Sequence, residues 1–360
     1  MKIFGYIRAC LIVLEAKGMD YDLLFFKAKG KSLPPLPENT ILSQAFNSID
    51  RYVFSVKHRK VYNDIVTKLN PDNYFMSHAH SLMSNGYISY RLKQDYSIPY
   101  IVAVRNTDIF TFFRLMPHLI PLGRKIMNDA YKIIFISPKY KDYMLSRYIK
   151  PKDLESIDKK SIVISNGIDG LFLEDYEPKD NLIEDTIRLI FVGRVDDSNK
   201  NVRTLVKACD FLLSKGHKLK LTLVGRLEKD IYKKFILNRD YIEYLGTQDV
   251  LGVRSSLRNS DIFVMPSKHE TFGLVYAEAM SQGLPVIYTK NQGFDGYYPE
   301  GQVGYHVVHN DSKQIADKIL KIVDNYNTMS KNAIIGSKRF NWDSISDEYI
   351  MIYKELLEDK

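Results

Sequence analysis

Asp261-Ile-Phe-Val-Met-Pro-Ser-Lys-His-Glu-Thr-Phe-Gly-Leu-Val-Tyr-Ala-Glu-Ala-Met-Ser-Gln-Gly-Leu-Pro285 is the most informative run of this chain, which has 360 residues. Its apolar residues 262–265 predict a short buried strand, and a polar loop follows them. A helix is expected to begin near Gly273. Glu270 falls in the loop and Glu278 inside the helix, eight positions later. The run therefore predicts a strand-loop-helix unit with two carboxylates close to the start of its helix.

The start of this helix is a candidate phosphate site. A helix N-terminus carries unpaired N–H groups and a partial positive charge, which favour an anion. Helical side chains lean toward the N-terminus, so Glu278 can reach back to a ligand bound there. Carboxylates accept hydrogen bonds from sugar hydroxyls while the phosphate takes the N–H groups. Taken as an isolated pair, the two glutamates are equally compatible with an ordinary helix surface.

The whole run closely resembles the E-x7-E segment of retaining glycosyltransferases with the GT-B fold, those of family four, also called group 1. The resemblance implies an α/β fold of two doubly wound, Rossmann-like domains that face a cleft. It also implies that Glu270 holds hydroxyls of the donor sugar and that Glu278 holds the ribose. The expected donor-binding residues of this run are Thr271, Phe272, Gly273, Leu274 and Glu278.

Gly193-Arg194 and Lys200 form a second signal, because they follow the predicted strand 187–192. Ligands of open α/β sheets bind at the carboxyl ends of the strands. Arginine offers a fork of donors to a diphosphate, and lysine adds a mobile charge. An exposed ion pair would explain the two cations as well. The resemblance implies that Arg194 and Lys200 bind the diphosphate, and that Arg226-Leu227 lies in a loop flanking the base and ribose.

Ser77-His-Ala-His80 follows a predicted strand in the first half of the chain. The resemblance implies that one histidine lies near the transferred sugar; His80 fits best and His78 is the alternative. Arg105, Thr107 and Asp108 follow another strand, and we place them on the acceptor side. A helix-capping cluster explains them equally well. No metal is expected: Asp20-Tyr-Asp22 is interpreted as a turn and Asp196-Asp197 as a solvated loop.

Composition restricts the kind of protein. Apolar residues make up 45% of the chain, and no apolar run reaches the roughly 18–20 residues of a membrane-spanning helix. The N-terminus lacks the pattern of a signal peptide. Cys10 and Cys209 are far apart, as expected of unpaired thiols in a reducing compartment. We therefore expect a cytoplasmic protein.

The net charge of +8 is unevenly distributed. Residues 1–165 carry 25 Lys and Arg against 14 Asp and Glu, whereas residues 166–360 carry 26 against 29. A basic half favours an anionic partner such as a lipid-linked acceptor or the inner face of a membrane. It is also compatible with a solvated basic surface. No zinc-finger spacing or RNA-binding signature appears, so nucleic acid is not expected.

Short apolar strands alternate with helical patterns, which predicts parallel, helix-covered sheets. The predicted strands are 21–26, 74–77, 100–104, 133–136, 162–165, 187–192, 218–224, 241–245, 262–265, 285–288 and 305–308. Asn166-Gly-Ile-Asp169 reads as an interdomain turn. We expect an acceptor-binding domain over 1–165, a nucleotide-sugar-binding domain over 166–342, and a last helix, 343–360, that packs back on the first domain.

The N-terminus departs from the expected pattern. A doubly wound domain begins with a strand and a glycine-rich turn, but here the apolar stripe of residues 3–14 predicts a helix at once. The resembling family has a strand and a Gly-Gly loop before this helix. We therefore expect that this strand is missing, either because the recorded start lies downstream of the true one or because the domain lost it.

These observations predict a retaining, metal-independent glycosyltransferase without a cofactor. It would move a sugar from a nucleoside-diphosphate sugar to a lipid-linked or polysaccharide acceptor, as in cell-surface polysaccharide biosynthesis. Two alternatives stay open. One is a nucleotide-sugar epimerase of the same fold, and the other is a non-catalytic protein that binds a membrane surface.

Overall fold

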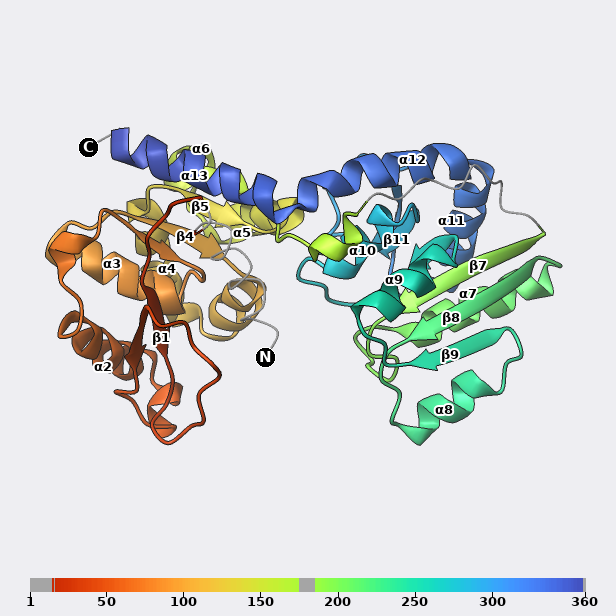
Figure 1. The fold of residues 1–360 in the computed structure, drawn as a ribbon, viewed down its shortest axis with the longest axis horizontal. Coiled ribbons are helices and arrows are strands. Elements are labelled where there is room, and N and C mark those ends of the chain that lie inside the picture. The colour runs from red at the N-terminus through yellow and green to blue at the C-terminus, as the bar shows by residue number, and fades with distance from the viewer. Residues whose placement is uncertain (1–14, 16, 175–184, 359–360) are drawn as a thin grey trace. The chain divides into compact units, whose positions relative to one another are not determined.

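The structure is a computed structural model that describes residues 15, 17–174 and 185–358. The chain forms two compact units (Figure 1). Unit 1 contains residues 1–136, 141–164 and 346–360, and unit 2 contains residues 137–140 and 165–345. The helix predicted over residues 3–14 lies outside the described residues.

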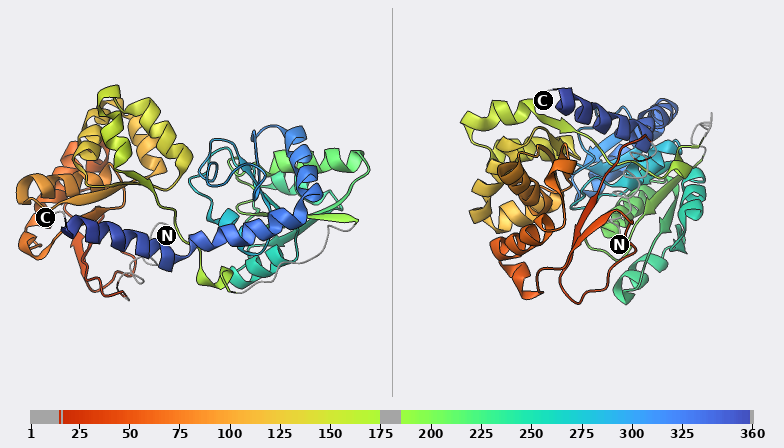
Figure 2. Two further views of the ribbon diagram at one scale, coloured as in Figure 1. Left: turned by 90° about the horizontal axis from the view of Figure 1, so that it is seen from above. Right: turned by 60° about the vertical axis from the view of Figure 1, so that its left-hand side comes forward.

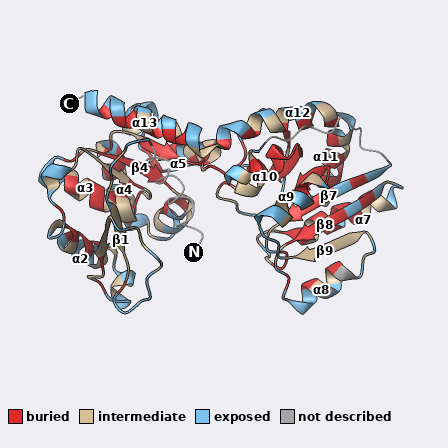
Figure 3. Ribbon diagram, viewed as in Figure 1, coloured by how far each residue is buried: buried red, intermediate tan, exposed pale blue. Residues whose placement is uncertain are grey.

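Unit 2 is built on a parallel sheet of six strands in the order β12-β11-β10-β7-β8-β9. The apolar side chains of its strands are buried, whereas its two longest strands also carry exposed polar residues (Figure 3). The strands are β7 (Thr186–Val192), β8 (Lys218–Val224), β9 (Ile242–Gly246), β10 (Ile262–Val264), β11 (Val286–Thr289) and β12 (Gly304–Val307).

The helices of unit 2 bury one apolar side each. In α7, Val202, Leu205, Val206 and Cys209 recur at helical spacing and are fully buried. The helices are α7 (Val202–Ser214), α8 (Asp230–Leu237), α9 (Val250–Arg258), α10 (Leu274–Ser281), α11 (Ser312–Asp324) and α12 (Tyr326–Ser337).

Unit 1 contains two parallel sheets. Four strands pair in the order β3-β4-β5-β6, and β1 pairs with β2. The strands are β1 (Leu23–Phe26), β2 (Thr40–Ser43), β3 (Ser77–Ala79), β4 (Tyr100–Val104), β5 (Ile133–Phe135) and β6 (Ser161–Val163). The helices are α2 (Phe54–Val66), α3 (Ser84–Tyr96), α4 (Ile120–Asp129), α6 (Pro151–Lys159) and α5 (Pro138–Tyr148), of which residues 138–140 belong to unit 2.

In unit 1 one predicted strand is displaced and one observed strand was not predicted. The strand expected at residues 74–77 is β3, at Ser77–Ala79. The preceding residues instead form a short turn, Pro71–Asn73, which the Asn70 side chain caps. The strand β2 was not predicted at all, because it has only four residues and follows a loop with three prolines.

The last helix, α13 (Trp342–Glu358), contributes to both units in turn. Residues up to Ile345 belong to unit 2, and residues from Ser346 belong to unit 1, along which the helix runs (Figure 2). In unit 1 the Tyr353 hydroxyl lies 2.8 Å from Nδ1 of His78. None of the helices in the described part of the chain has the length and apolarity needed to cross a bilayer.

Candidate active site

The sheet of unit 2 reverses its strand order between β7 and β10. From β7 the chain proceeds to β8 and β9 on one side, and then returns to place β10 on the other side. In open α/β sheets, the loops that leave the carboxyl ends of two such strands diverge and leave room for a ligand. The loop after β7 carries Arg194 and Lys200, and the loop after β10 carries Glu270.

Glycines shape the carboxyl edge of this sheet. Gly193 and Gly225 follow β7 and β8, and both have positive φ angles, +156° and +133°. A Cβ atom on Gly225 would lie 1.9 Å from the carbonyl oxygen of Gly193. No side chain fits into that space, so glycine at position 225 lets the two turns pass each other closely.

Two asparagines join the loop after β7 to the loop after β10. The Asn199 side chain donates to the His269 carbonyl over 2.8 Å and accepts from the His269 N–H over 3.0 Å. The Asn201 side chain donates to the Pro266 carbonyl over 3.1 Å. These bonds hold Lys200 against the second loop. Neither asparagine was predicted as part of the site.

Lys200 and Glu270 meet directly, with 2.5 Å between Nζ and Oε2. Both side chains are largely buried, at 24% and 14% exposure. The other oxygen of Glu270 accepts from the Thr271 N–H over 3.2 Å. A cation and a carboxylate predicted from separate motifs therefore lie side by side at the reversal of strand order.

Arg194 is held in the same loop by Asp196, with 2.8 Å between Nε and Oδ1. The other Asp196 oxygen accepts from the N–H groups of Glu228 and Lys229. The bond from Arg194 holds the pKa of Asp196 well below its usual range. The prediction of a solvated loop was wrong for Asp196, which is fully buried because it binds two turns together.

The second of these turns contains the remaining donor-side prediction, Arg226-Leu227. Arg226 forms an ion pair with Glu228, and Leu227 is buried. The Val195 N–H donates to the Arg226 carbonyl over 2.9 Å, which ties this turn to the loop after β7. Arg226 therefore lies on a turn adjoining the one that carries Arg194.

Tyr140 and Gln292 fix the backbone of Glu270, and sequence reasoning missed both. The Tyr140 hydroxyl donates to the Glu270 carbonyl over 2.5 Å, and the Gln292 side chain accepts from the Glu270 N–H over 3.1 Å. A Cβ atom on Gly293 would lie 1.9 Å from the Thr271 carbonyl oxygen. The position of Gln292, just after β11, was the one available signal, since strand ends line such sites.

The helix that follows Glu270 begins as predicted. Gly273 adopts a left-handed conformation, with φ of +78°, and Leu274 opens α10. Phe272 is buried against Phe294, Tyr297 and Phe340, which leaves its main chain as the part available to a ligand. Glu278 lies half-buried in the second turn of the helix.

In unit 1, His80 stacks on His78 with 4.2 Å between ring centroids. Burial, with a smaller effect of Arg105, lowers the pKa of His80 to about 3, so the ring is neutral at physiological pH. Nδ1 of His80 is buried and has no hydrogen-bond partner among the described residues. The carbonyl of His80 accepts from Nε of Arg105 over 3.0 Å.

Asp108 is fully buried, next to Arg105 and Thr107 in sequence. Its carboxylate accepts hydrogen bonds from the N–H groups of Leu82, Met83 and Arg105. These bonds fix the turn before α3 and the turn after β4, so the carboxylate has a capping role. Whether this cluster also meets an acceptor stays a prediction.

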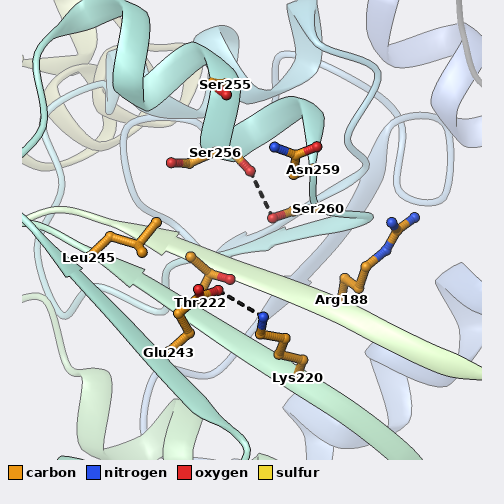
Figure 4. A pocket seen from close by; sticks show the side chains of 9 residues that line it. All are labelled: Arg188, Lys220, Thr222, Glu243, Leu245, Ser255, Ser256, Asn259 and Ser260. Atoms are coloured by element: carbon orange, nitrogen blue, oxygen red, sulfur yellow. Dashed lines mark hydrogen bonds and ion pairs between the residues drawn. The ribbon is translucent and has the colours of Figure 1, made fainter.

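A separate hollow of about 280 Å³ lies between α9 and the strands β7, β8 and β9 (Figure 4). It is lined toward the amino ends of β7 and β8 by Arg188 and Lys220, and Lys220 pairs with Glu243 at 2.9 Å. None of the predicted site residues lines it. In the part of the chain that the structure describes, no three His, Cys, Asp or Glu residues are grouped to hold a metal ion.

Residues 174–339 match the family model of glycosyl transferases group 1. This match covers a little less than half of the 360 residues. The matched segment contains the whole site described for unit 2 except Tyr140, which lies upstream of it.

Curated proteins also resemble the chain, and some of these similarities cover more of it than residues 174–339. The chain is 28% identical to an uncharacterized glycosyltransferase of Methanocaldococcus jannaschii, over 78% of this chain and 75% of that protein. It is 26% identical to the capsular polysaccharide biosynthesis glycosyltransferase CapM of Staphylococcus aureus, over 71% of each chain. It is 23% identical to a phosphatidyl-myo-inositol mannosyltransferase of Mycobacterium leprae, over about half of each chain (56% and 55%).

Solved structures match the fold over nearly the whole chain. Sucrose-phosphate synthase from Thermosynechococcus elongatus aligns with a TM-score of 0.73 at 21% identity, over 99% of this chain and 93% of that one. HepE of Anabaena, in complex with UDP and glucose, aligns with a TM-score of 0.60 at 17% identity, over 88% and 85%. The chain therefore has the GT-B fold, with two Rossmann-like domains.

Proposed function

We propose that this chain is a retaining glycosyltransferase of family four that uses a nucleoside-diphosphate sugar. One observation carries the proposal: Lys200 and Glu270 are paired where the strand order reverses, beside the N-terminus of α10. A cation, a carboxylate and free N–H groups together suit a sugar attached to a diphosphate. The match of residues 174–339 to glycosyl transferases group 1 supports the same reading.

Each group has a proposed role. Arg194, Lys200 and the N–H groups at Gly273 would stabilise the leaving diphosphate, because fixed charge placed where charge develops is usually the largest catalytic effect. Glu278 would hold the ribose. Glu270 would hold hydroxyls of the transferred sugar, with its backbone fixed by Tyr140 and Gln292.

The proposed reaction is a front-face displacement. The acceptor hydroxyl attacks the anomeric carbon, and the bond from that carbon to the phosphate oxygen breaks on the same face. The hydroxyl proton passes to the departing phosphate oxygen. Protein cations would take the place of a metal ion, and no cofactor is needed. Neutral His80 would accept or donate a hydrogen bond at the donor sugar, a role that suits a ring that stays uncharged.

The proposed acceptor is lipid-linked or a glycan, bound by the basic N-terminal part of the chain. The similarity to CapM and to a phosphatidyl-myo-inositol mannosyltransferase supports this class of acceptor. A peripheral position at the inner face of a membrane would fit the charge of residues 1–165, with 25 basic against 14 acidic residues.

The test is to incubate the full chain with a panel of nucleoside-diphosphate sugars and a lipid extract, and to identify products by mass spectrometry. Titration calorimetry with UDP, GDP and ADP measures donor binding independently. Lys200→Ala should lower the transfer rate by roughly 10²–10³, whereas Lys207→Ala, at an exposed lysine of α7, should leave it unchanged.

Two outcomes would contradict the proposal. Absence of binding to every nucleoside diphosphate would remove the donor site. Conversion of the free sugar nucleotide without any acceptor would identify an epimerase instead.

A further inference from the structure

An exposed apolar patch lies at the start of α2 in unit 1. It consists of Ile49 and Tyr52 in the short 3-10 turn η1 (Ile49–Tyr52), together with Val53 and Val56; we call it the η1–α2 patch. Ile49 is 80% exposed and Tyr52 is 88% exposed. Neighbouring apolar side chains in a folded protein are seldom left in water without a partner surface.

The core of unit 1 does not need this patch. The inner side of α2 is already buried through Val61, Tyr62 and Ile65, which pack against α3 and the strands β1 and β2. The chain is extended at Val53, with φ of −117° and ψ of +101°, and this kink separates η1 from α2. The patch is therefore a second apolar surface on the same segment.

The patch is firmly attached to unit 1. Nζ of Lys57 lies over the rings of Phe26 and Phe46, at 5.2 and 5.4 Å from their centroids. One turn of helix beyond Phe54, His58 is buried and its Nδ1 lies 2.8 Å from the Phe54 carbonyl. These contacts hold the start of α2 against the core of unit 1.

Basic side chains surround the patch. Arg51 and Arg59 are exposed and form no ion pair with any residue that the structure describes. Lys60 pairs with Asp50 at 2.8 Å, and Lys29 adds to the positive field that lowers the pKa of the Asp50 carboxyl, after the larger effects of the Lys60 and Asn47 hydrogen bonds. The one acidic group inside η1 is thus neutralised, and the surface around the apolar residues is positive.

We propose that the η1–α2 patch docks on the surface of an anionic lipid bilayer. A partner that satisfies both features must offer an apolar layer beneath a negatively charged one, and a bilayer rich in anionic headgroups offers both. Tyr52 suits the boundary between them, because a tyrosine ring is apolar at its base and polar at its tip. Arg51 and Arg59 meet the lipid phosphates.

Other partners fit less well. A second copy of the chain, bound patch to patch, would bring the same arginines of both copies together, since a two-fold contact places identical surfaces against each other. A nucleic acid would satisfy the arginines and leave Ile49 and Val53 in water. The bilayer is the partner whose chemistry matches every residue of the patch.

The experiment measures binding of the full chain to vesicles of phosphatidylcholine alone and with phosphatidylglycerol, by co-sedimentation without any donor sugar. Ile49→Ser with Tyr52→Ser should weaken binding to the charged vesicles by at least about tenfold, from the loss of apolar burial. Arg51→Gln with Arg59→Gln should weaken it roughly 25-fold, about fivefold per basic residue, and leave binding to neutral vesicles unchanged.

Matched controls are Ile335→Ser, an apolar residue of α12 that is 67% exposed, and Lys207→Gln with Lys313→Gln, two exposed lysines of unit 2. They should bind vesicles as the parent chain does. No binding of the parent chain to charged vesicles, or equal binding of patch and control variants, would overturn the proposal. A change in oligomeric state alone, seen by sedimentation velocity, would assign the patch to a second copy.

This docking surface rests on the proposed function in one respect: an enzyme with a lipid-linked acceptor has to reach a membrane. Calorimetry with nucleoside diphosphates separates the two, because the patch variants should bind nucleotide as the parent chain does. Loss of nucleotide binding in every variant, with vesicle binding still dependent on the patch, would remove the proposed donor site and leave the docking surface intact.

Discussion

Lys200 and Glu270 were predicted as single residues of two motifs, and the structure places their side chains in contact. Both residues could be predicted as part of the site because each motif follows an apolar strand, and the carboxyl ends of the strands of a parallel sheet lie at one edge. Tyr140 could not be predicted in this way, and Gln292 offered only its position after β11 as a signal. They act on the main chain of Glu270, 130 and 22 positions away, and main-chain contacts leave no pattern of residue types.

The two glutamates of the site should differ in what they contribute. A ribose contact is equally strong in the ground and transition states, so Glu278→Gln should mainly raise KM for the donor. A contact to the transferred sugar strengthens as charge develops, so Glu270→Gln should mainly lower kcat. Steady-state kinetics with a varied donor concentration separate the two; equal changes of both parameters in both variants would contradict the assignment.

Buried histidines should make the protein sensitive to acid. Burial lowers the pKa of His58 to about 4, with help from Lys57, lowers that of His80 to about 3, and also lowers that of His78. Unfolded histidines titrate near pH 6.5, so below that pH the unfolded chain binds more protons than the folded one. The free energy of unfolding should therefore decrease as pH falls from about 7 to 5, by about 2 kcal/mol per histidine.

Urea unfolding at pH 7 and pH 5 measures this effect. His58→Phe should reduce the loss of unfolding free energy between the two values by about 2 kcal/mol relative to the parent chain. Packing changes caused by the substitution cancel, because the quantity compared is a difference between two pH values. An unchanged difference would show that His58 is protonated in the folded protein.

Among the elements, the loop after β10 depends on contacts beyond its own sequence. It is joined to the loop after β7 by Asn199 and Asn201, and to the unit 2 segment 137–140 by Tyr140. The strands that frame it were predicted to within one or two residues, because each contains a run of three or more apolar residues. The strand β2 was missed because it follows a loop with three prolines, and β3 was displaced because its own residues, Ser-His-Ala, contain no apolar run.

Removing the Tyr140 hydroxyl tests this dependence. Tyr140→Phe keeps the ring and loses the hydrogen bond to the Glu270 carbonyl, which should lower the free energy of unfolding by about 1 kcal/mol. Because Glu270 would then be less well held, kcat should fall several-fold while KM for the donor changes little. Tyr96→Phe, at an exposed tyrosine of unit 1, is the control and should change neither. A Tyr140→Phe variant with the parent kcat would show that the loop keeps its position without this bond.

At the scale of the whole molecule, the sequence predicted two α/β domains with parallel sheets, and the fold confirms this architecture. The predicted division at residue 165 remains a prediction. The chain passes between the two units after residues 136, 140, 164 and 345, and not through a single linker. Residues 137–140 belong to unit 2 and residues 346–360 to unit 1. No local signal marks the exchange at residues 137–140, whereas the resemblance to the family led us to expect that the last helix, 343–360, packs back on the first domain.

The exchanged segments have a consequence for proteolysis. A single cut between residues 164 and 165 would yield two fragments, each of which retains a piece of the other's unit: residues 137–140 in the first and residues 346–360 in the second. The nicked protein should therefore elute as one species from a size-exclusion column and separate only in denaturant. Two species in native buffer would show that the exchanged segments contribute too little to hold severed halves together.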